Sequence, residues 1–278
     1  PLKFSFDGLK EVHSKFFNPL KNTYNFFVMY ANADKIDTDE CNVKYEDLDL
    51  IDKWLLSKYN TLVKNVRASF DEYDLNKVVH FLTDFVCEDL SNWYIRRNRN
   101  RFWDSHLTTS KKAVYKTTYD VLVGLSKLIA PICPYISEEM YRNLTNEESV
   151  HLSNYPVVNE EYINSTIEEK MDKVRDLISL GRNAREDSKI KVRIPLATVI
   201  IDGKLEDLLG DLTNLIIEEL NVKNLEFTKD LSKYMNLTIK PNFRVAGSMF
   251  GKDIKAYQEL LLNLREEDKL KLNNKEEL

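Results

Sequence analysis

Apolar side chains recur every three or four residues through the first half of the chain, which is the spacing of one face of an α-helix. The pattern fills four long stretches, at residues 7–31, 47–73, 74–93 and 110–130. A shorter helix is predicted after Pro131 and Pro134 as far as Leu144, and Asp74 stands where a capping side chain would begin the third helix. Four or five amphipathic helices joined by short links predict an antiparallel bundle.

The same apolar stripes predict which side chains form the core of the bundle. We expect the core to contain Trp54, Leu62, Val79, Leu82, Phe85 and Leu122. His80 lies among apolar positions of the third helix, so we expect it to be a core histidine.

The pattern changes after an extended, proline-containing segment at residues 151–159. Helices are predicted over residues 165–185, 206–221 and 252–265, and strands over residues 192–202, 222–227 and 235–240. This mixture predicts a small α+β domain. We therefore expect two domains: a helical bundle in residues 1–155, and a C-terminal α+β domain with its connecting helix in residues 156–278.

Composition supports a mainly helical protein but gives a mixed picture of its partners. Of 278 residues, 31% are charged and only 7 are glycine and 7 proline. No apolar stretch is long enough to suggest a membrane span. A net charge of −5 counts against a nucleic-acid binder, yet Ser91–Lys127 holds eight basic residues against two acidic ones, a local charge of +6. A locally basic face is compatible with binding a polyanion.

Residues that could carry catalysis or hold a metal are not grouped in the sequence. Cys41, Cys87 and Cys133 are far apart, which argues against a zinc site or a disulfide framework and favours a reducing cytoplasm. The four histidines have no serine or cysteine partner at a recognisable spacing, and neither glycine-rich nucleotide-binding pattern occurs. We therefore expect no catalytic residue, metal or cofactor in this chain.

The strongest local feature is the segment LSNWYIRRNRNRFW, from Leu90 to Trp103, in which four arginines fall within six positions. Arginine makes bidentate phosphate contacts and aromatic rings stack on unpaired bases, so the composition suits RNA. A solvated or ion-paired arginine cluster explains the segment equally well. At about 100° per residue, Trp93 and Arg97 continue the apolar stripe while Arg99 faces solvent. Arg97 is then paired with a buried acid or lies on a helix end that extends beyond the bundle.

A second basic segment lies near the end of the chain. Lys240, Arg244 and Lys252 could contact phosphates, and Gly247 and Gly251 could let backbone amides approach them. A strand end followed by a helix that begins at a glycine explains this segment more simply.

The segment Leu90–Trp103 resembles a run typical of isoleucyl-tRNA synthetases, in the form found in archaea, eukaryotes and a subset of bacteria. Further similar segments are WLLSK at 54–58, LIAPICPYISEE at 128–139, SVHL at 149–152, KVRIPL at 191–196 and KPNF at 240–243. The resemblance covers nearly the whole chain. It implies the anticodon-binding helix bundle of a class I synthetase followed by its C-terminal domain.

In that family a Rossmann catalytic domain with an inserted editing domain precedes this region. Its ATP-binding motifs, of the His-Ile-Gly-His and Lys-Met-Ser-Lys-Ser types, do not occur here. The resemblance thus implies a fragment that is inactive alone, from a monomeric, cytoplasmic isoleucine–tRNA ligase that uses ATP and magnesium. Its implied partner is the anticodon arm of isoleucine tRNA. The equivalent region of a valyl- or leucyl-tRNA synthetase, and a helical protein-interaction scaffold that binds no RNA, are the alternatives.

The expected tRNA-contacting residues combine both basic segments with the first helix. Related synthetases often have Leu-Trp-Asn where this chain has Leu20-Lys21-Asn22, so a stacking tryptophan is absent there, while Phe26 matches a position that faces the anticodon loop in a related synthetase. The full expected set is Asn22, Phe26, Trp93, Arg96, Arg97, Arg99, Arg101, Trp103, Lys240, Asn242, Phe243, Arg244 and Lys252. Arginines would hold phosphates, Phe26, Trp103 and Phe243 would stack on bases, and the asparagines would read base edges.

Overall fold

A computed structural model describes residues 5–231, 233–234, 251–264 and 268–269 of the chain. The chain divides into two compact units, residues 1–173 and 174–278, and each is described by itself. The domain boundary expected after residue 155 stays a prediction. The strand expected over residues 235–240, together with Lys240, Asn242, Phe243 and Arg244, lies outside the described residues.

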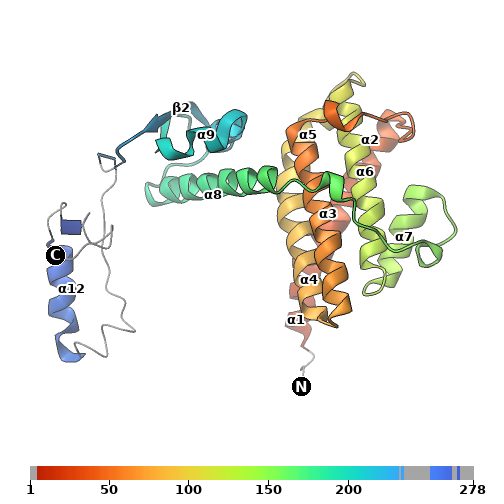
Figure 1. Cartoon of the computed structure of the whole chain (residues 1–278), viewed down its shortest axis with the longest axis horizontal. Helices are drawn as coiled ribbons and strands as arrows, with labels where there is room; N and C mark the ends of the chain where they lie inside the picture. Colours follow the sequence, from red (N-terminus) through yellow and green to blue (C-terminus); the bar gives the residue numbers. More distant parts are fainter. Residues whose placement is uncertain (1–4, 232, 235–250, 265–267, 270–278) are drawn as a thin grey trace. The chain divides into compact units, whose positions relative to one another are not determined.

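The first unit is built of helices that lie side by side (Figure 1). They are α1 (Phe6–Val12), α2 (Asn18–Asp34), α3 (Leu50–Asp71), α4 (Leu75–Asp84), α5 (Arg96–Trp103), α6 (Thr109–Ile129) and α7 (Pro134–Thr145). Two π-helical segments, η1 (His13–Phe17) and η3 (Phe85–Ile95), connect α1 to α2 and α4 to α5. Short 3-10 turns lie at η2 (Tyr45–Asp47), η4 (Val150–Leu152) and η5 (Glu160–Tyr162). The helices predicted from the apolar spacing are thus confirmed.

Local chemistry at the helix ends follows the sequence signals. The side chain of Asp74 accepts a hydrogen bond from the Lys77 backbone amide at 3.1 Å, so the predicted cap of α4 is confirmed. Pro134 occupies the first turn of α7, where its missing N–H costs nothing. Asn146 ends α7 in the left-handed conformation, which asparagine tolerates better than most residues.

The core of the first unit confirms most of the predicted residues. Trp54, Leu62, Leu82, Phe85 and Leu122 are all buried. The expectation for two neighbours in α4 was wrong: Val79 is 47% exposed and His80 is exposed as well.

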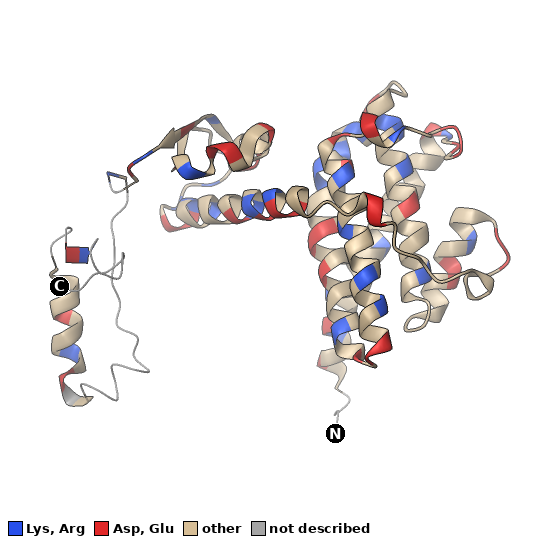
Figure 2. Cartoon of the chain, viewed as in Figure 1, with Lys and Arg blue, Asp and Glu red and all other residues tan. Residues whose placement is uncertain are grey.

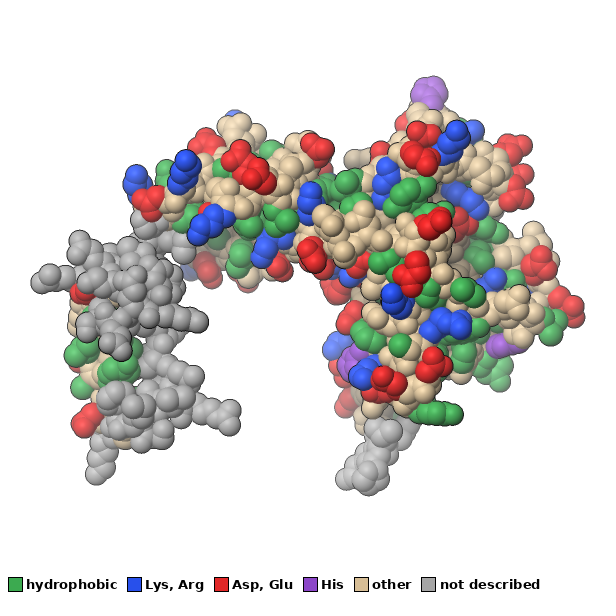
Figure 3. Space-filling model, viewed as in Figure 1, with side chains coloured by type: hydrophobic (Ala, Val, Ile, Leu, Met, Phe, Trp, Pro, Cys, Tyr) green, Lys and Arg blue, Asp and Glu red, His purple; other side chains and the backbone are tan. Residues whose placement is uncertain are grey.

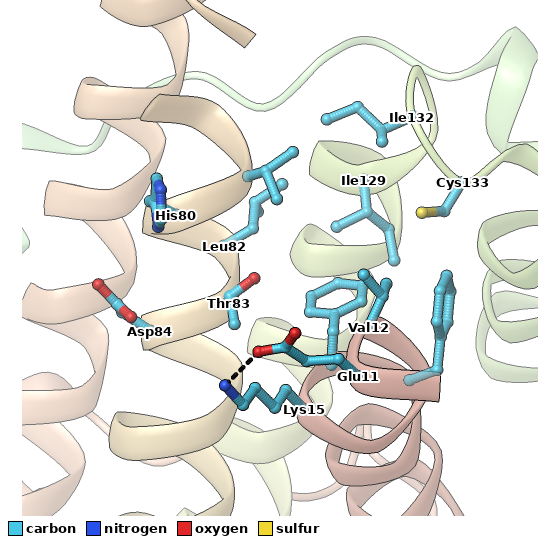
Figure 4. A pocket seen from close by; sticks show the side chains of 13 residues that line it. Glu11, Val12, Lys15, His80, Leu82, Thr83, Asp84, Ile129, Ile132 and Cys133 are labelled. Atoms are coloured by element: carbon cyan, nitrogen blue, oxygen red, sulfur yellow. Dashed lines mark hydrogen bonds and ion pairs between the residues drawn. The ribbon is translucent and has the colours of Figure 1, made fainter. Parts of the chain in front are cut away.

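Val79 and His80 line an open, largely apolar groove of about 610 Å³, bounded by α1, η1, α4 and the link between α6 and α7 (Figure 4). The buried face of α4 carries Val78 and Leu82 instead. Val79 and His80 stay accessible because the groove is open at their side of α4, although their sequence spacing is that of a core stripe.

The second unit contains a small parallel sheet. Its elements are the end of α8 (Ser165–Asp187), β1 (Leu196–Asp202), η6 (Gly203–Leu205), α9 (Glu206–Leu209), η7 (Gly210–Leu212), α10 (Thr213–Leu220), β2 (Val222–Thr228), η8 (Gly251–Asp253) and α12 (Ile254–Leu262). β1 pairs with β2 in parallel, from Leu196 opposite Val222 to Asp202 opposite Thr228 (Figure 1). Parallel strands need a crossover, which α9 and α10 supply.

Three predicted boundaries in this unit differ from the structure. The strand expected from residue 192 begins only at Leu196, because residues 191–194 form a turn and Pro195 has no N–H for a strand ladder. The helix expected over residues 206–221 is broken at Gly210, whose φ of +45° favours glycine. The last helix starts two residues later than expected, at Ile254.

A buried arginine holds the second unit together. Arg185, in the last turn of α8, is 4% exposed. Its guanidinium donates to the backbone carbonyls of Leu220 at 2.6 Å, Ile194 at 3.0 Å and Asn221 at 3.1 Å. It therefore connects α8 to the end of α10 and to the residues just before β1.

All three cysteines are free thiols. Cys41, in the chain segment that connects α2 to α3, is buried, whereas Cys87 in η3 and Cys133 before α7 are half-buried. Burial raises the pKa of each thiol above its ordinary value. No helix in the described ranges is long and apolar enough to cross a lipid bilayer. Over the same residues, no group of three or more His, Cys, Asp or Glu side chains could hold a metal ion.

Candidate nucleic-acid interface

The arginine-rich segment is the helix α5, which continues directly from the π-helical η3. Trp93, in η3, is 5% exposed, and its ring packs against the guanidinium groups of Arg96 and Arg97, at 5.8 and 5.6 Å from the ring centroid. Such cation–π contacts hold the guanidinium groups in place against the ring. Any contribution of Trp93 to RNA binding would therefore act through these two arginines, which are half-buried, whereas Arg99 is exposed.

Arg101 points into the bundle instead. Its Nη1 and Nη2 donate to the two carboxylate oxygens of Asp52 at 2.8 and 2.7 Å, and Asp52 is fully buried. Nη2 also donates to the backbone carbonyl of Ser110 at 2.6 Å and lies 3.2 Å from Asp49, the capping residue of α3. One side chain thus joins α5 to the first turns of α3 and α6.

Two further buried groups complete the hydrogen bonds around Asp52. The Tyr94 hydroxyl donates to Asp52 Oδ1 at 2.6 Å, and Asn98 Oδ1 accepts from Arg101 Nη1 at 3.0 Å. Asn98 Nδ2 in turn donates to the Tyr94 carbonyl at 2.9 Å. Burial, followed by the neighbouring Asp52 charge, raises the pKa of Tyr94 well above its usual value. Tyr94 therefore stays a neutral donor, and the buried carboxylate is paired and hydrogen-bonded.

A second buried cation of the basic segment is also used internally. Lys111 is 3% exposed, and its Nζ lies 2.7 Å from Asp34 and donates to the Asp104 carbonyl at 2.5 Å. The Tyr115 hydroxyl donates to Asp34 at 2.6 Å. Burial raises the pKa of Asp34, but the hydrogen bonds from Lys111 and Tyr115 and the Lys111 charge outweigh it, so the pKa is lowered. Part of the local charge of +6 is thus neutralised within the bundle.

An aromatic cluster links α2 to the end of α5. The ring of Phe26 lies 5.1 Å from that of Phe102 and 4.8 Å from that of Tyr30. Trp103, 54% exposed, donates its Nε1–H to the Tyr30 hydroxyl at 2.7 Å. Asn22 is exposed one turn before Phe26 on the same helix.

The structure thus brings together only part of the expected set. Phe26 and Trp103 both contact Tyr30 where α2 meets α5, and Asn22 lies one turn before Phe26 on α2. Trp93 contacts Arg96 and Arg97 in a second cluster at the start of α5. Lys252 lies in η8 of the second unit, and its side chain is outside the described residues. Tyr30 was not among the residues predicted from the sequence. Its position four residues after Phe26 on α2 was the available signal, since residues at that spacing share a helix face.

Charge on the described surface is mixed in sign. Lys and Arg positions gather along α5 in Figure 2, while acidic and basic side chains alternate over the face of the first unit seen in Figure 3. Arg99, which is exposed, lies one helical turn before the exposed indole of Trp103 and offers a cationic hydrogen-bond donor beside it. Such a combination can bind a phosphate backbone and a base face together.

This chain is similar to known proteins over most of its length. The family model of the anticodon-binding domain of tRNA ligase matches residues 52–201. The isoleucine–tRNA ligase of Clostridium novyi (strain NT) is 41% identical over 274 residues, which are 95% of this chain and 26% of the relative. That of Clostridium acetobutylicum is 42% identical over 91% of this chain and 24% of the relative. That of Chlamydia trachomatis serovar L2 is 41% identical over 96% of this chain and 26% of the relative.

The chain therefore spans about a quarter of the length of the curated relatives that it matches. The family match covers more than half of the chain and includes the whole arginine-rich segment. The chain belongs to the anticodon-binding domain family of tRNA ligases.

Proposed function

We propose that this chain recognises the anticodon arm of isoleucine tRNA as part of a longer isoleucine–tRNA ligase that charges its tRNA using ATP and magnesium. The observation that carries the proposal is the exposed Arg99 beside the exposed Trp103, inside the segment matched by the anticodon-binding family. The relatives named above, all called isoleucine–tRNA ligase, support isoleucine over valine or leucine. This chain has neither nucleotide-binding motif, so ATP would bind elsewhere in the ligase.

Further parts of the proposal rest on the resemblance and on chemistry. The helices of the first unit would form the antiparallel anticodon-binding bundle of class I synthetases. The run Leu90–Trp103 supports the form typical of archaea, eukaryotes and a subset of bacteria. We propose a monomeric ligase in the cytoplasm, where free thiols such as Cys41 stay reduced.

Within the interface we propose different roles for the arginines. Arg96, Arg97 and Arg99 would contact phosphates, since guanidinium groups on a helix can follow a nucleic-acid backbone without reading its bases. Arg101 would have a structural role instead of contacting phosphate, because its guanidinium holds α5 against α3 and α6. Asn22 would supply hydrogen bonds to a base edge, and Phe26 would support the base next to it.

The second candidate function is a helical scaffold that binds proteins and no RNA. The apolar groove lined by Val79 and Ile132 is the observation in its favour. Filter binding with isoleucine tRNA at low and moderate salt separates the two: the proposed function requires binding that weakens as salt rises, and the scaffold predicts none.

We predict that the purified chain catalyses no isoleucine-dependent exchange between pyrophosphate and ATP. That partial reaction needs a nucleotide site, and neither synthetase motif nor any glycine-rich phosphate loop occurs in the sequence. The assay follows label from pyrophosphate into ATP with and without isoleucine. Exchange above background that depends on isoleucine would contradict the prediction.

A second prediction separates phosphate contacts from base reading. Arg99→Ala should weaken binding of all tRNAs similarly and make the salt dependence shallower, by about 0.7–0.9 in log–log slope. Asn22→Ala should instead reduce the difference in Kd between tRNAs with isoleucine and non-cognate anticodons. The log–log salt slope should stay at its wild-type value. Filter binding over a salt series measures both.

The matched control is Arg142→Ala, which removes an exposed arginine from α7 outside the interface and should change neither affinity nor slope. If Arg99→Ala loses the preference for the isoleucine anticodon while Asn22→Ala keeps it, the roles assigned to these two residues are wrong.

A further inference from the structure

Trp103, the last residue of α5, has an exposed indole ring whose position is fixed by a hydrogen bond. The sequence has three tryptophans, of which Trp54 and Trp93 are buried and Trp103 is 54% exposed. Indole has a single hydrogen-bond donor, and Trp103 directs it to the Tyr30 hydroxyl at 2.7 Å. Because Tyr30 belongs to α2, this bond ties the exposed ring to a second helix and limits its rotation.

Tyr30 itself packs against other aromatic rings. Its ring lies 4.8 Å from Phe26 and 6.5 Å from Phe102. Phe102 is 1% exposed and meets Phe26 edge-on at 5.1 Å and Tyr115 edge-on at 4.9 Å. The exposed indole is therefore supported by contacts that reach the core of the bundle. A surface held in this way loses little conformational freedom when a ligand binds to it.

The charge beside the indole indicates what would cover it. Arg99 lies four residues before Trp103, one helical turn away, and is exposed. A cationic group next to a flat, exposed ring suits an unpaired nucleotide, whose base stacks while its phosphate meets the guanidinium. An apolar protein segment would gain nothing from Arg99.

We propose that Trp103 is the stacking platform for one unpaired base of the bound RNA, and that Tyr30 is the positioning residue that holds the indole in place. This inference rests on the proposed function and adds to it a residue, Tyr30, and a defined contact. The base stacks on the exposed face of Trp103, and the hydroxyl of Tyr30 fixes the ring from its edge.

The role of Tyr30 can be tested before RNA is added. Each tryptophan gives one indole N–H resonance in an ¹H–¹⁵N spectrum, and Trp103→Phe identifies its own by deletion. Tyr30→Phe keeps the ring and removes the acceptor. It should shift the Trp103 indole resonance and speed its exchange with solvent, while the resonances of Trp54 and Trp93 stay in place. An unchanged Trp103 resonance in Tyr30→Phe would overturn the positioning role.

Binding of isoleucine tRNA to the full chain tests the platform. Saturating tRNA should shift the Trp103 indole resonance and protect its fluorescence from acrylamide. Trp103→Ala should raise Kd roughly 5- to 100-fold, as expected for one lost stacked base. Tyr30→Phe should raise Kd about 2- to 10-fold, the effect of one neutral hydrogen bond. Both variants should keep the wild-type salt slope, because neither removes a charge.

The matched control is Tyr135→Phe, which removes the hydroxyl of a tyrosine that is 91% exposed on α7 and should bind like the wild type. Thermal unfolding of each variant checks that it is folded at the assay temperature. Wild-type binding that leaves the Trp103 resonance unmoved, or wild-type affinity in Trp103→Ala, would overturn the platform alone. If the wild-type chain binds no tRNA, the proposed function and the platform are both overturned.

Discussion

Replacing Arg101 with alanine is expected to lower the free energy of unfolding of the first unit by about 3–5 kcal/mol. The change would leave the fully buried Asp52 carboxylate with only Tyr94 as a hydrogen-bond donor among its present partners. An uncompensated buried charge costs far more than a lost surface contact. All three tryptophans lie in the first unit, so urea unfolding followed by tryptophan fluorescence reports on it selectively.

Two variants make this test sharp. Arg99→Ala removes an arginine of the same helix that is exposed, and its effect should stay within about 0.5 kcal/mol. Asp52→Asn should be destabilising by itself, and the double variant with Arg101→Ala should cost less than the two single changes added together. Equal costs for Arg99→Ala and Arg101→Ala would show that the ion pair does not stabilise the unit.

Replacing Arg185 with alanine should destabilise the second unit by about 2–5 kcal/mol. The guanidinium satisfies the carbonyls of Leu220, Ile194 and Asn221, and leaving a buried acceptor unsatisfied costs about 1–3 kcal/mol. The carbonyls at the end of α10 also favour a cation at this position. Hydrogen–deuterium exchange of the β1 and β2 backbone amides measures the loss.

Arg193→Ala is the control, since Arg193 is an exposed arginine of the turn before β1. Arg185→Lys should recover only part of the protection, because one ammonium cannot reproduce a planar fork that bonds several carbonyls. Protection of β1 and β2 that survives Arg185→Ala unchanged would show that Arg185 does not hold the unit together.

Helical periodicity was sufficient to place α2, α3, α4 and α6, because each of these helices buries one stripe of side chains. The errors came where a stripe is not covered. Val79 has the spacing of a core residue, but it faces a groove. Periodicity identifies the apolar face of a helix and gives no information on whether another element lies against it. The broken helix at Gly210 has a local cause that one glycine in a helical pattern does not reveal.

The arginine segment shows a different limit. Composition identified it, yet the four arginines have different environments. Arg101 pairs with Asp52 and Asp49, about 50 positions earlier in the chain, and sequence spacing cannot reveal such a partner. The π-helical η3 also affects the prediction of helix faces. Its hydrogen bonds span five residues, so faces assigned at about 100° per residue along η3 are no longer correct when the chain reaches α5.

The three partly or fully buried thiols allow local opening of the first unit to be followed by chemical modification. Alkylating reagents attack the thiolate, and a raised pKa leaves little thiolate at neutral pH, so each cysteine reacts slowly until its surroundings open. Cys87 lies in η3, which continues without a break into α5 at Arg96. Its thiol donates a hydrogen bond to the Lys15 carbonyl. The rate at which Cys87 is alkylated therefore reports local opening of η3, the segment that leads into the arginine-rich helix α5. No engineered cysteine is needed for this measurement. The alkylation rates of Cys41 and Cys133 report in the same way on local opening of the α2–α3 and α6–α7 connections.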